Sequence, residues 1–132
     1  MNILSKSEFI LYVENQAKST EFYTQLFQME PILNVPGMSE FQLNETTKLG
    51  LMPNLGIQKI LHDKVPNPAS GTGIPRCELY LFVENLEEAF ENAMNCGAKL
   101  ISPMEERSWG DRVCYFADLD GHIIAFAKSL NS

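Results

Sequence analysis

The sequence lacks the features of several protein classes. No stretch of its 132 residues approaches the run of about 18 apolar residues that a transmembrane helix needs. The N-terminal stretch MNILSKSEF has no long apolar core of the signal-peptide kind. The three cysteines, Cys77, Cys96 and Cys114, are odd in number and lack the spacing of a metal site. We therefore expect reduced thiols, no membrane partner and a cytoplasmic location.

Positive charge is also scarce. Ten Lys and Arg face 17 Asp and Glu, which gives a net charge of −7. Residues 67–132 hold most of the excess, with 5 basic and 10 acidic side chains. Because nucleic-acid phosphates require a basic patch, this balance argues against a nucleic-acid partner, and it favours a cationic small molecule or simply solubility. No phosphate loop or dinucleotide fingerprint occurs, so we predict no cofactor.

The chain contains an internal repeat. EFILYVEN at residues 8–15 returns as ELYLFVEN at residues 78–85, with five of eight positions identical. Strand side chains alternate between faces, so each copy has an aliphatic face and a face with a carboxylate and aromatic rings. A sheet that lines a concave pocket accounts for the second face.

Each copy leads into a helix that Asn15 or Asn85 can cap, and then into three short strands. We expect these strands near 31–35, 39–43 and 48–53, and again near 99–102, 112–117 and 122–127. The pattern predicts a first βαβββ module over 1–56 and a second over 76–132. The Pro- and Gly-rich stretch between them, with 57–75 as its main part, predicts a linker or a loop over a pocket.

Two βαβββ modules with this spacing resemble the glyoxalase/bleomycin-resistance/dioxygenase superfamily, the vicinal oxygen chelate proteins. The most specific segment is WGDRVCYFADLDGHIIAFA at residues 109–127, which is similar to the closing hairpin of that family. VENQAKSTEFYTQLF at residues 13–27 resembles its first strand-to-helix passage. The resemblance implies an α+β fold in which the modules form a cup-shaped mixed sheet with helices outside.

The resemblance also implies four metal-ligand positions, which fall here on Glu8, Gly50, Glu78 and Ala125. Gly50 and Ala125 have no donor side chain, so we predict no catalytic metal. The metal-free bleomycin-resistance proteins are similar in the Trp-Gly-x-Arg pattern of residues 109–112. Those proteins are dimers that sequester a cationic antibiotic, so the resemblance implies a homodimer and a drug-sequestering role.

The candidate ligand-binding residues share the carboxylate and aromatic face or flank the closing hairpin: Glu8, Tyr12, Glu78, Tyr80, Phe82, Trp109 and Arg112. By the symmetry of the repeat, we expect the two glutamates to face each other across the module axis. Two close carboxylates raise each other's pKa unless a cation lies between them. The ordinary alternatives are strand-end charges for the glutamates, core packing for the rings, and a structural salt bridge for Arg112, for example with Glu78.

Three functions remain open from the sequence. The first is a metal-free protein that binds a small cationic or aromatic molecule. The second is a divalent-metal-dependent lyase, isomerase or dioxygenase that uses Glu8, Glu78 and a further ligand. The third is an interaction or regulatory module whose cup is filled by side chains.

Overall fold

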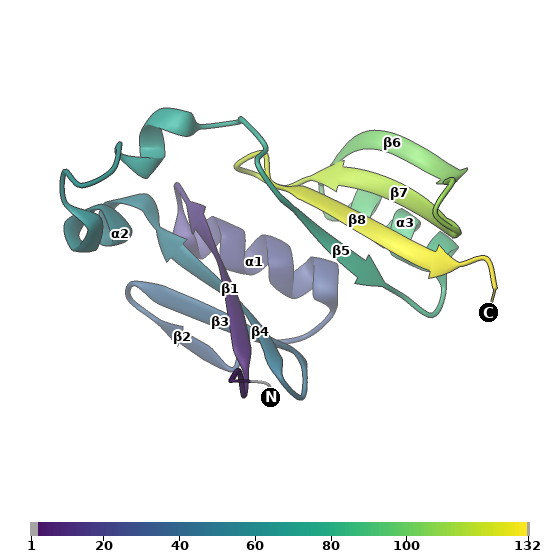
Figure 1. Cartoon of the computed structure of the whole chain (residues 1–132), viewed down its shortest axis with the longest axis horizontal. Helices are drawn as coiled ribbons and strands as arrows, with labels where there is room; N and C mark the ends of the chain where they lie inside the picture. The colour runs from purple at the N-terminus through teal and green to yellow at the C-terminus, as the bar shows by residue number, and fades with distance from the viewer. Residues whose placement is uncertain (1–2, 132) are drawn as a thin grey trace. The chain divides into compact units, whose positions relative to one another are not determined.

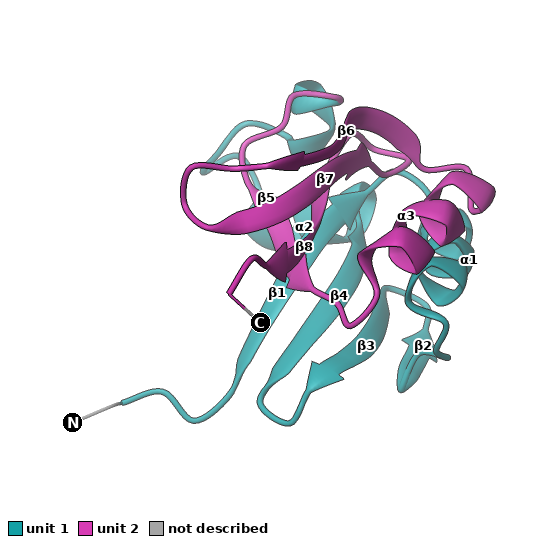
Figure 2. Cartoon of the chain, turned by 90° about the vertical axis from the view of Figure 1, so that its right-hand side faces the viewer, with its two compact units in different colours: residues 1–72 teal, residues 73–132 magenta. Residues whose placement is uncertain are grey.

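The computed structural model describes residues 3–131 (Figure 1). The chain divides into two compact units, residues 1–72 and residues 73–132 (Figure 2). Each unit contains one four-stranded sheet and follows the order βαβββ, so the predicted α+β fold and its internal repeat are confirmed.

Unit 1 begins with the first repeated strand and its helix. Its elements are β1 (Ser7–Val13), α1 (Gln16–Phe27), β2 (Leu33–Val35), β3 (Met38–Asn44) and β4 (Thr47–Pro53). The sheet order is β1-β4-β3-β2, with β1 parallel to β4 and the other pairs antiparallel. The α1 helix packs on the sheet through aromatic contacts, including Phe27 and Tyr23 with Phe41. We call the sheet face that points away from α1 the open face of unit 1.

Unit 2 repeats this arrangement. Its elements are β5 (Glu78–Phe82), α3 (Leu86–Asn95), β6 (Lys99–Glu106), β7 (Asp111–Ala117) and β8 (Ile123–Ser129). The sheet order is β5-β8-β7-β6, and β5 is parallel to β8. On the α3 side of the sheet, the ring of Phe116 contacts Phe90 of α3 and Phe126 of β8. The other sheet face is called the open face of unit 2.

The two helices begin where the sequence predicts. Asn15 accepts a hydrogen bond from the Lys18 amide at 3.0 Å, and Asn85 accepts one from the Glu88 amide at 3.0 Å. These caps satisfy backbone donors that the first helical turn leaves without a partner. The repeated Val-Glu-Asn therefore ends a strand and starts a helix in both units.

The stretch between the modules contains more structure than the sequence led us to expect. Residues Asn54–Leu61 form the helix α2, and Pro68–Gly71 form the short 3-10 turn η1. Ile57 is the buried residue of α2, whereas Leu55 and Ile60 are exposed. Within residues 3–131, no helix has both the length and the apolar character needed to cross a membrane.

Candidate functional site

Glu8 lies on the open face of unit 1, as strand alternation predicts. The β1 register pairs Glu8 with Lys48 and Ile10 with Gly50 of β4. A Cβ atom added to Gly50 would lie 2.5 Å from Glu8 Oε2, so the glutamate carboxyl occupies the space beside this glycine. Glu8 and Gly50, two of the four implied metal-ligand positions, are therefore direct neighbours, and Gly50 has no donor side chain.

A second carboxyl group, which the sequence reasoning missed, accompanies Glu8. Glu40 of β3 pairs with Gly50 from the other side of β4 and forms an ion pair with Lys48 at 3.3 Å. Burial raises the pKa of Glu8, and a hydrogen bond with Glu40 and the Glu40 charge raise it further, while Lys48 acts in the opposite direction. The sequence located β3 but could not supply the lateral register that brings Glu40 to Gly50.

On the open face of unit 2, Tyr80 is the centre of a hydrogen-bonded chain. Trp109 Nε1 donates to the Tyr80 hydroxyl at 2.8 Å, and this hydroxyl donates to Asp111 Oδ2 at 2.7 Å. Burial raises the pKa of the Tyr80 hydroxyl; the Trp109 hydrogen bond opposes this and Asp111 adds to it. The phenol therefore stays protonated and fixes the indole relative to the carboxylate.

Phe82 extends this aromatic surface. Its ring lies edge to face with Tyr80, with a centroid distance of 5.4 Å. Phe82 is 64% exposed and Trp109 is 57% exposed, which is unusual for rings of this size. We call Tyr80, Phe82, Trp109 and Asp111 the Trp109 surface.

The position of Ala125 is packed with apolar side chains. Ala125 pairs with Tyr80 on one side and Tyr115 on the other, and both rings pack against a buried cluster that includes Ala125. The Arg107 guanidinium lies 5.4 Å from the Tyr115 ring centroid. This open face thus already holds one cation on an aromatic ring, an interaction of about 0.5–2 kcal/mol.

Three further residues were predicted to bind the ligand, and only the partner of Arg112 differs from the expected one. Arg112 lies on the α3 side of the sheet and pairs with Glu87 of that helix at 2.8 Å, and this is the ion pair found for it rather than one with Glu78. Glu78 is exposed at the start of β5, and Tyr12 is exposed on β1. Alternation along β7 could have predicted that Arg112 lies on the α3 side. Arg112 shares a face with Cys114 and Phe116, whereas Asp111 shares the opposite face with Tyr115.

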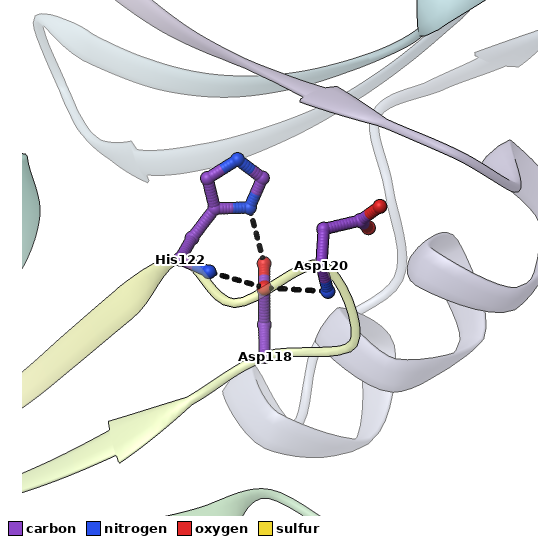
Figure 3. Close-up of side chains that lie close together, drawn as sticks. All are labelled: Asp118, Asp120 and His122. Carbon is purple, nitrogen blue, oxygen red and sulfur yellow. Dashed lines mark hydrogen bonds and ion pairs between the residues drawn. The ribbon is translucent and has the colours of Figure 1, made fainter. Parts of the chain in front are cut away.

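Asp118, Asp120 and His122 form a further cluster in the turn between β7 and β8 (Figure 3). Their ligand-type atoms lie within 4.8 Å of one another. Asp118, however, accepts hydrogen bonds from the Asp120 amide (2.9 Å) and the His122 amide (2.8 Å), and its other oxygen contacts His122 Nδ1 at 2.8 Å. We interpret this carboxylate as the residue that holds the turn, which the sequence predicts at residues 118–121.

The cysteines are free thiols within the described residues. Burial raises the pKa of Cys96 and of Cys114, which disfavours the reactive thiolate. Neither thiol is therefore a candidate nucleophile.

Comparisons with known proteins agree with this architecture. Residues 7–131 match the family described as the glyoxalase-like domain. A protein from Mycobacterium bovis is 28% identical over 115 residues, which cover 85% of this chain and 75% of that protein.

Solved structures show the same fold. A glyoxalase-related enzyme from Fulvimarina pelagi superposes with a TM-score of 0.77 at 24% identity, covering 92% of this chain and 85% of that one. A glyoxalase/bleomycin resistance protein/dioxygenase from Nocardioides gives a TM-score of 0.79 at 20% identity, covering 100% and 87%. At these identities the likeness concerns the fold alone.

Proposed function

Because the chain belongs to the family of glyoxalase-like domains, we propose that it binds a small planar cation without a catalytic metal and acts by sequestration. The observation that carries this proposal is the Trp109 surface. Exposed rings offer a stacking platform, and the half-buried Asp111 carboxylate supplies negative charge at its edge. The excess of acidic over basic residues favours the same ligand charge.

The residues at the four ligand positions of the superfamily do not fit a transition metal. Gly50 and Ala125 supply no donor atom, and the Tyr80 and Tyr115 rings pack around Ala125. Zn²⁺, Ni²⁺ and Fe²⁺ favour imidazole or thiolate ligands, and neither is present at these four positions.

Binding can be tested by calorimetry with proflavine, a planar cation, and with naphthalene sulfonate as an anionic aromatic control. Trp109 is the single tryptophan, so its fluorescence reports independently on ligands at this surface. We expect proflavine to bind and the sulfonate not to bind. Asp111→Asn should weaken proflavine binding about tenfold, which corresponds to ~1.4 kcal/mol.

Glu91→Gln is the matched control, since it removes one negative charge from an exposed position on α3. It should leave the affinity within about twofold, because a solvent-exposed charge is strongly screened. An equal loss of proflavine affinity in both variants would point to general charge attraction. If the wild-type protein does not bind proflavine, the proposal is wrong.

A second candidate is a divalent-metal-dependent lyase, isomerase or dioxygenase. The observation that favours it is the close approach of Glu8 and Glu40, because two carboxylates suit Mg²⁺ or Mn²⁺. A metal at 100 times its dissociation constant stabilises a protein by about 2.7 kcal/mol, which a thermal melt detects. We expect no such shift with Zn²⁺, Ni²⁺ or Fe²⁺. A saturable shift with Mg²⁺ or Mn²⁺ that a chelator reverses and that Glu8→Gln abolishes would establish a metal site at Glu8, which this second function requires.

A further inference from the structure

Arg107 is a cation on the open face of unit 2 whose hydrogen-bonding capacity is only partly used. Its guanidinium lies 5.4 Å from the centroid of the Tyr115 ring, and Nη2 donates to the Ser102 hydroxyl at 3.0 Å. Nη1 forms an ion pair with Glu105 at 3.5 Å. Nε is buried and has no acceptor among the described residues. Because a guanidinium has five N–H donors, this side chain retains donors for a further acceptor.

The unpaired Nε lowers the cost of turning the guanidinium toward a new acceptor. A buried donor without a partner is unfavourable, and this penalty disappears when an acceptor binds. The ion pair with Glu105 opposes such a turn only weakly, because the Glu105 side chain is 55% exposed and water screens its charge. The Arg107 side chain is 27% exposed, so a ligand on this face can reach it.

The shape of the guanidinium indicates which acceptor suits it. Nε and one Nη group form a planar fork that matches the two oxygens of a carboxylate. A carboxylate also brings a negative charge, which strengthens both hydrogen bonds, whereas a neutral carbonyl offers one oxygen and no charge. A carboxylate is therefore the ligand group that Arg107 fits best.

Arg107 lies next to the Trp109 surface along the chain and in the sheet. Its amide donates a hydrogen bond to the Asp111 carbonyl at 2.8 Å, and the Gly110 amide donates to the Arg107 carbonyl at 3.1 Å. These bonds close the turn between β6 and β7, and Trp109 lies within that turn. The turn therefore holds Arg107 and Trp109 in neighbouring parts of unit 2.

The guanidinium and the exposed rings lie within the span of one small molecule. Tyr115, whose ring the guanidinium covers, and Tyr80 pair with opposite sides of Ala125. Two strand spacings separate these tyrosines in the sheet, a distance of roughly 10 Å. A fused-ring ligand with one substituent spans this distance.

We propose that the ligand is a planar cation that also carries a carboxylate, and that Arg107 binds this carboxylate while the Trp109 surface binds the cationic rings. This ligand class rests on the function proposed above and adds a second charge to the ligand. A simple cation leaves Arg107 without a partner, and a simple anion loses the attraction of Asp111. The two opposite charges of unit 2 thus select a ligand with two opposite charges.

The test compares two dyes that differ in one group. Tetramethylrhodamine has a planar xanthylium cation and a carboxylate, and in its methyl ester the carboxylate is replaced by a neutral group. Fluorescence anisotropy of each dye with the full chain gives the two dissociation constants. We expect the carboxylate dye to bind at least about tenfold more tightly, because hydrogen bonds to charged groups are the stronger ones. The net charge of −7 and the more apolar ester both favour the opposite order, so neither can produce this preference.

Variants assign the preference to Arg107. Arg107→Met should remove it without weakening the binding of the methyl ester. Arg107→Lys keeps the charge but not the planar fork and should retain only part of the preference. Arg76→Met, which removes the same charge from an exposed position ahead of β5, is the matched control and should keep it.

Two results with these variants would overturn the proposal. One is a preference for the carboxylate dye that survives in Arg107→Met. The other is an equal loss of preference in Arg76→Met, which would indicate general charge attraction. If Arg107→Met does not fold, Arg107→Lys and the comparison of the two dyes on the wild-type chain decide.

NMR of the arginine side chains gives a direct readout. Arg76, Arg107 and Arg112 are the arginines of the chain, so their Nε–H signals can be assigned individually. The carboxylate dye should shift the Arg107 signal more than its methyl ester does and leave the Arg76 signal in place. If the methyl ester binds but the carboxylate dye binds no more tightly, this inference is wrong and the proposed function stands. If neither dye nor proflavine binds, the proposed function is wrong as well.

Discussion

At the scale of single residues, Asp118 shows how one carboxylate defines a turn. Its side chain is 1% exposed and receives two backbone amides and the His122 ring. A neutral replacement leaves these donors without their partner, and each buried donor costs about 1–3 kcal/mol. The Asp-Leu-Asp-Gly sequence predicts a turn, whereas the three bonds depend on the fixed geometry of β7 and β8.

His122 makes the stability of this turn dependent on pH. Burial lowers the pKa of His122, but the hydrogen bond with Asp118 and the charges of Asp118 and Asp120 outweigh it, and the net shift is upward from 6.5. A histidine with a raised folded pKa stabilises fully below its unfolded pKa, and the stabilisation is lost as the pH rises through its folded pKa. The unfolding free energy should therefore fall across that window, measured by urea denaturation at several pH values.

His122→Asn should remove this fall, because asparagine does not titrate. His62→Asn, which changes an exposed histidine in unit 1, should retain it. A wild-type profile that coincides with that of His122→Asn across this window would show that the Asp118 contact does not favour the charged ring.

The sequence predicts some residues of the candidate site and misses others for physical reasons. Tyr80 and Phe82 follow from alternation along a repeated strand, which is a local property. The role of Asp111 depends on Tyr80, 31 residues away, and that of Glu40 depends on Gly50, ten residues away. Both pairings require the lateral register of the strands. A short sequence window does not contain that register, which forms only when the sheet folds.

At the scale of elements, the repeat predicts strands and helix starts well because its signals are local. The caps at Asn15 and Asn85 and the antiparallel β7–β8 hairpin are found where the sequence predicts them. The α2 helix was missed because its eight residues are few and follow Pro53 in a stretch rich in breakers. Ile57 and Leu61 have helical spacing, but a helix this short depends on tertiary packing.

Two glycines allow the effect of backbone conformation on stability to be separated from the effect of packing. Gly97 ends α3 with φ +83°, and a Cβ there would meet open space. Gly121 has φ +89°, and a Cβ there would lie 3.0 Å from the Gly73 backbone. Gly97→Ala should cost about 1–2 kcal/mol from the left-handed conformation alone. Gly121→Ala should cost more, because the backbone of Gly73 must also move.

Chemical denaturation of both variants measures this difference, and the Gly97 variant serves as the control for conformational strain. Equal losses in the two variants would show that the turn near Gly73 accommodates a methyl group without strain.

At the scale of the whole molecule, each unit leaves apolar residues on its open face. Ile10 and Tyr12 are exposed in unit 1, and Phe82 and Trp109 are exposed in unit 2. The sheets also end in β2 and β6, whose outer edges have no partner strand among the described residues. The expectation that Glu8 and Glu78 face each other stays a prediction. If they do, Glu78→Gln should lower the pKa of Glu8, because it removes a like charge, and carbon-detected NMR of the glutamate carboxyl groups would measure this change.

Exposed edges and apolar faces together favour self-association, since both are costly to leave in water. We predict a homodimer that buries more than about 1,000 Å² in total, the area typical of a specific interface. Sedimentation at tens of micromolar should give twice the 14.9 kDa mass of the chain. The melting temperature should also rise with protein concentration, because unfolding is then coupled to dissociation. Asn85→Ala, which removes a helix cap, should lower the melting temperature by destabilising each chain about 1 kcal/mol, yet keep this concentration dependence. A single 14.9 kDa species whose melting temperature is independent of concentration would show that one chain covers these surfaces alone.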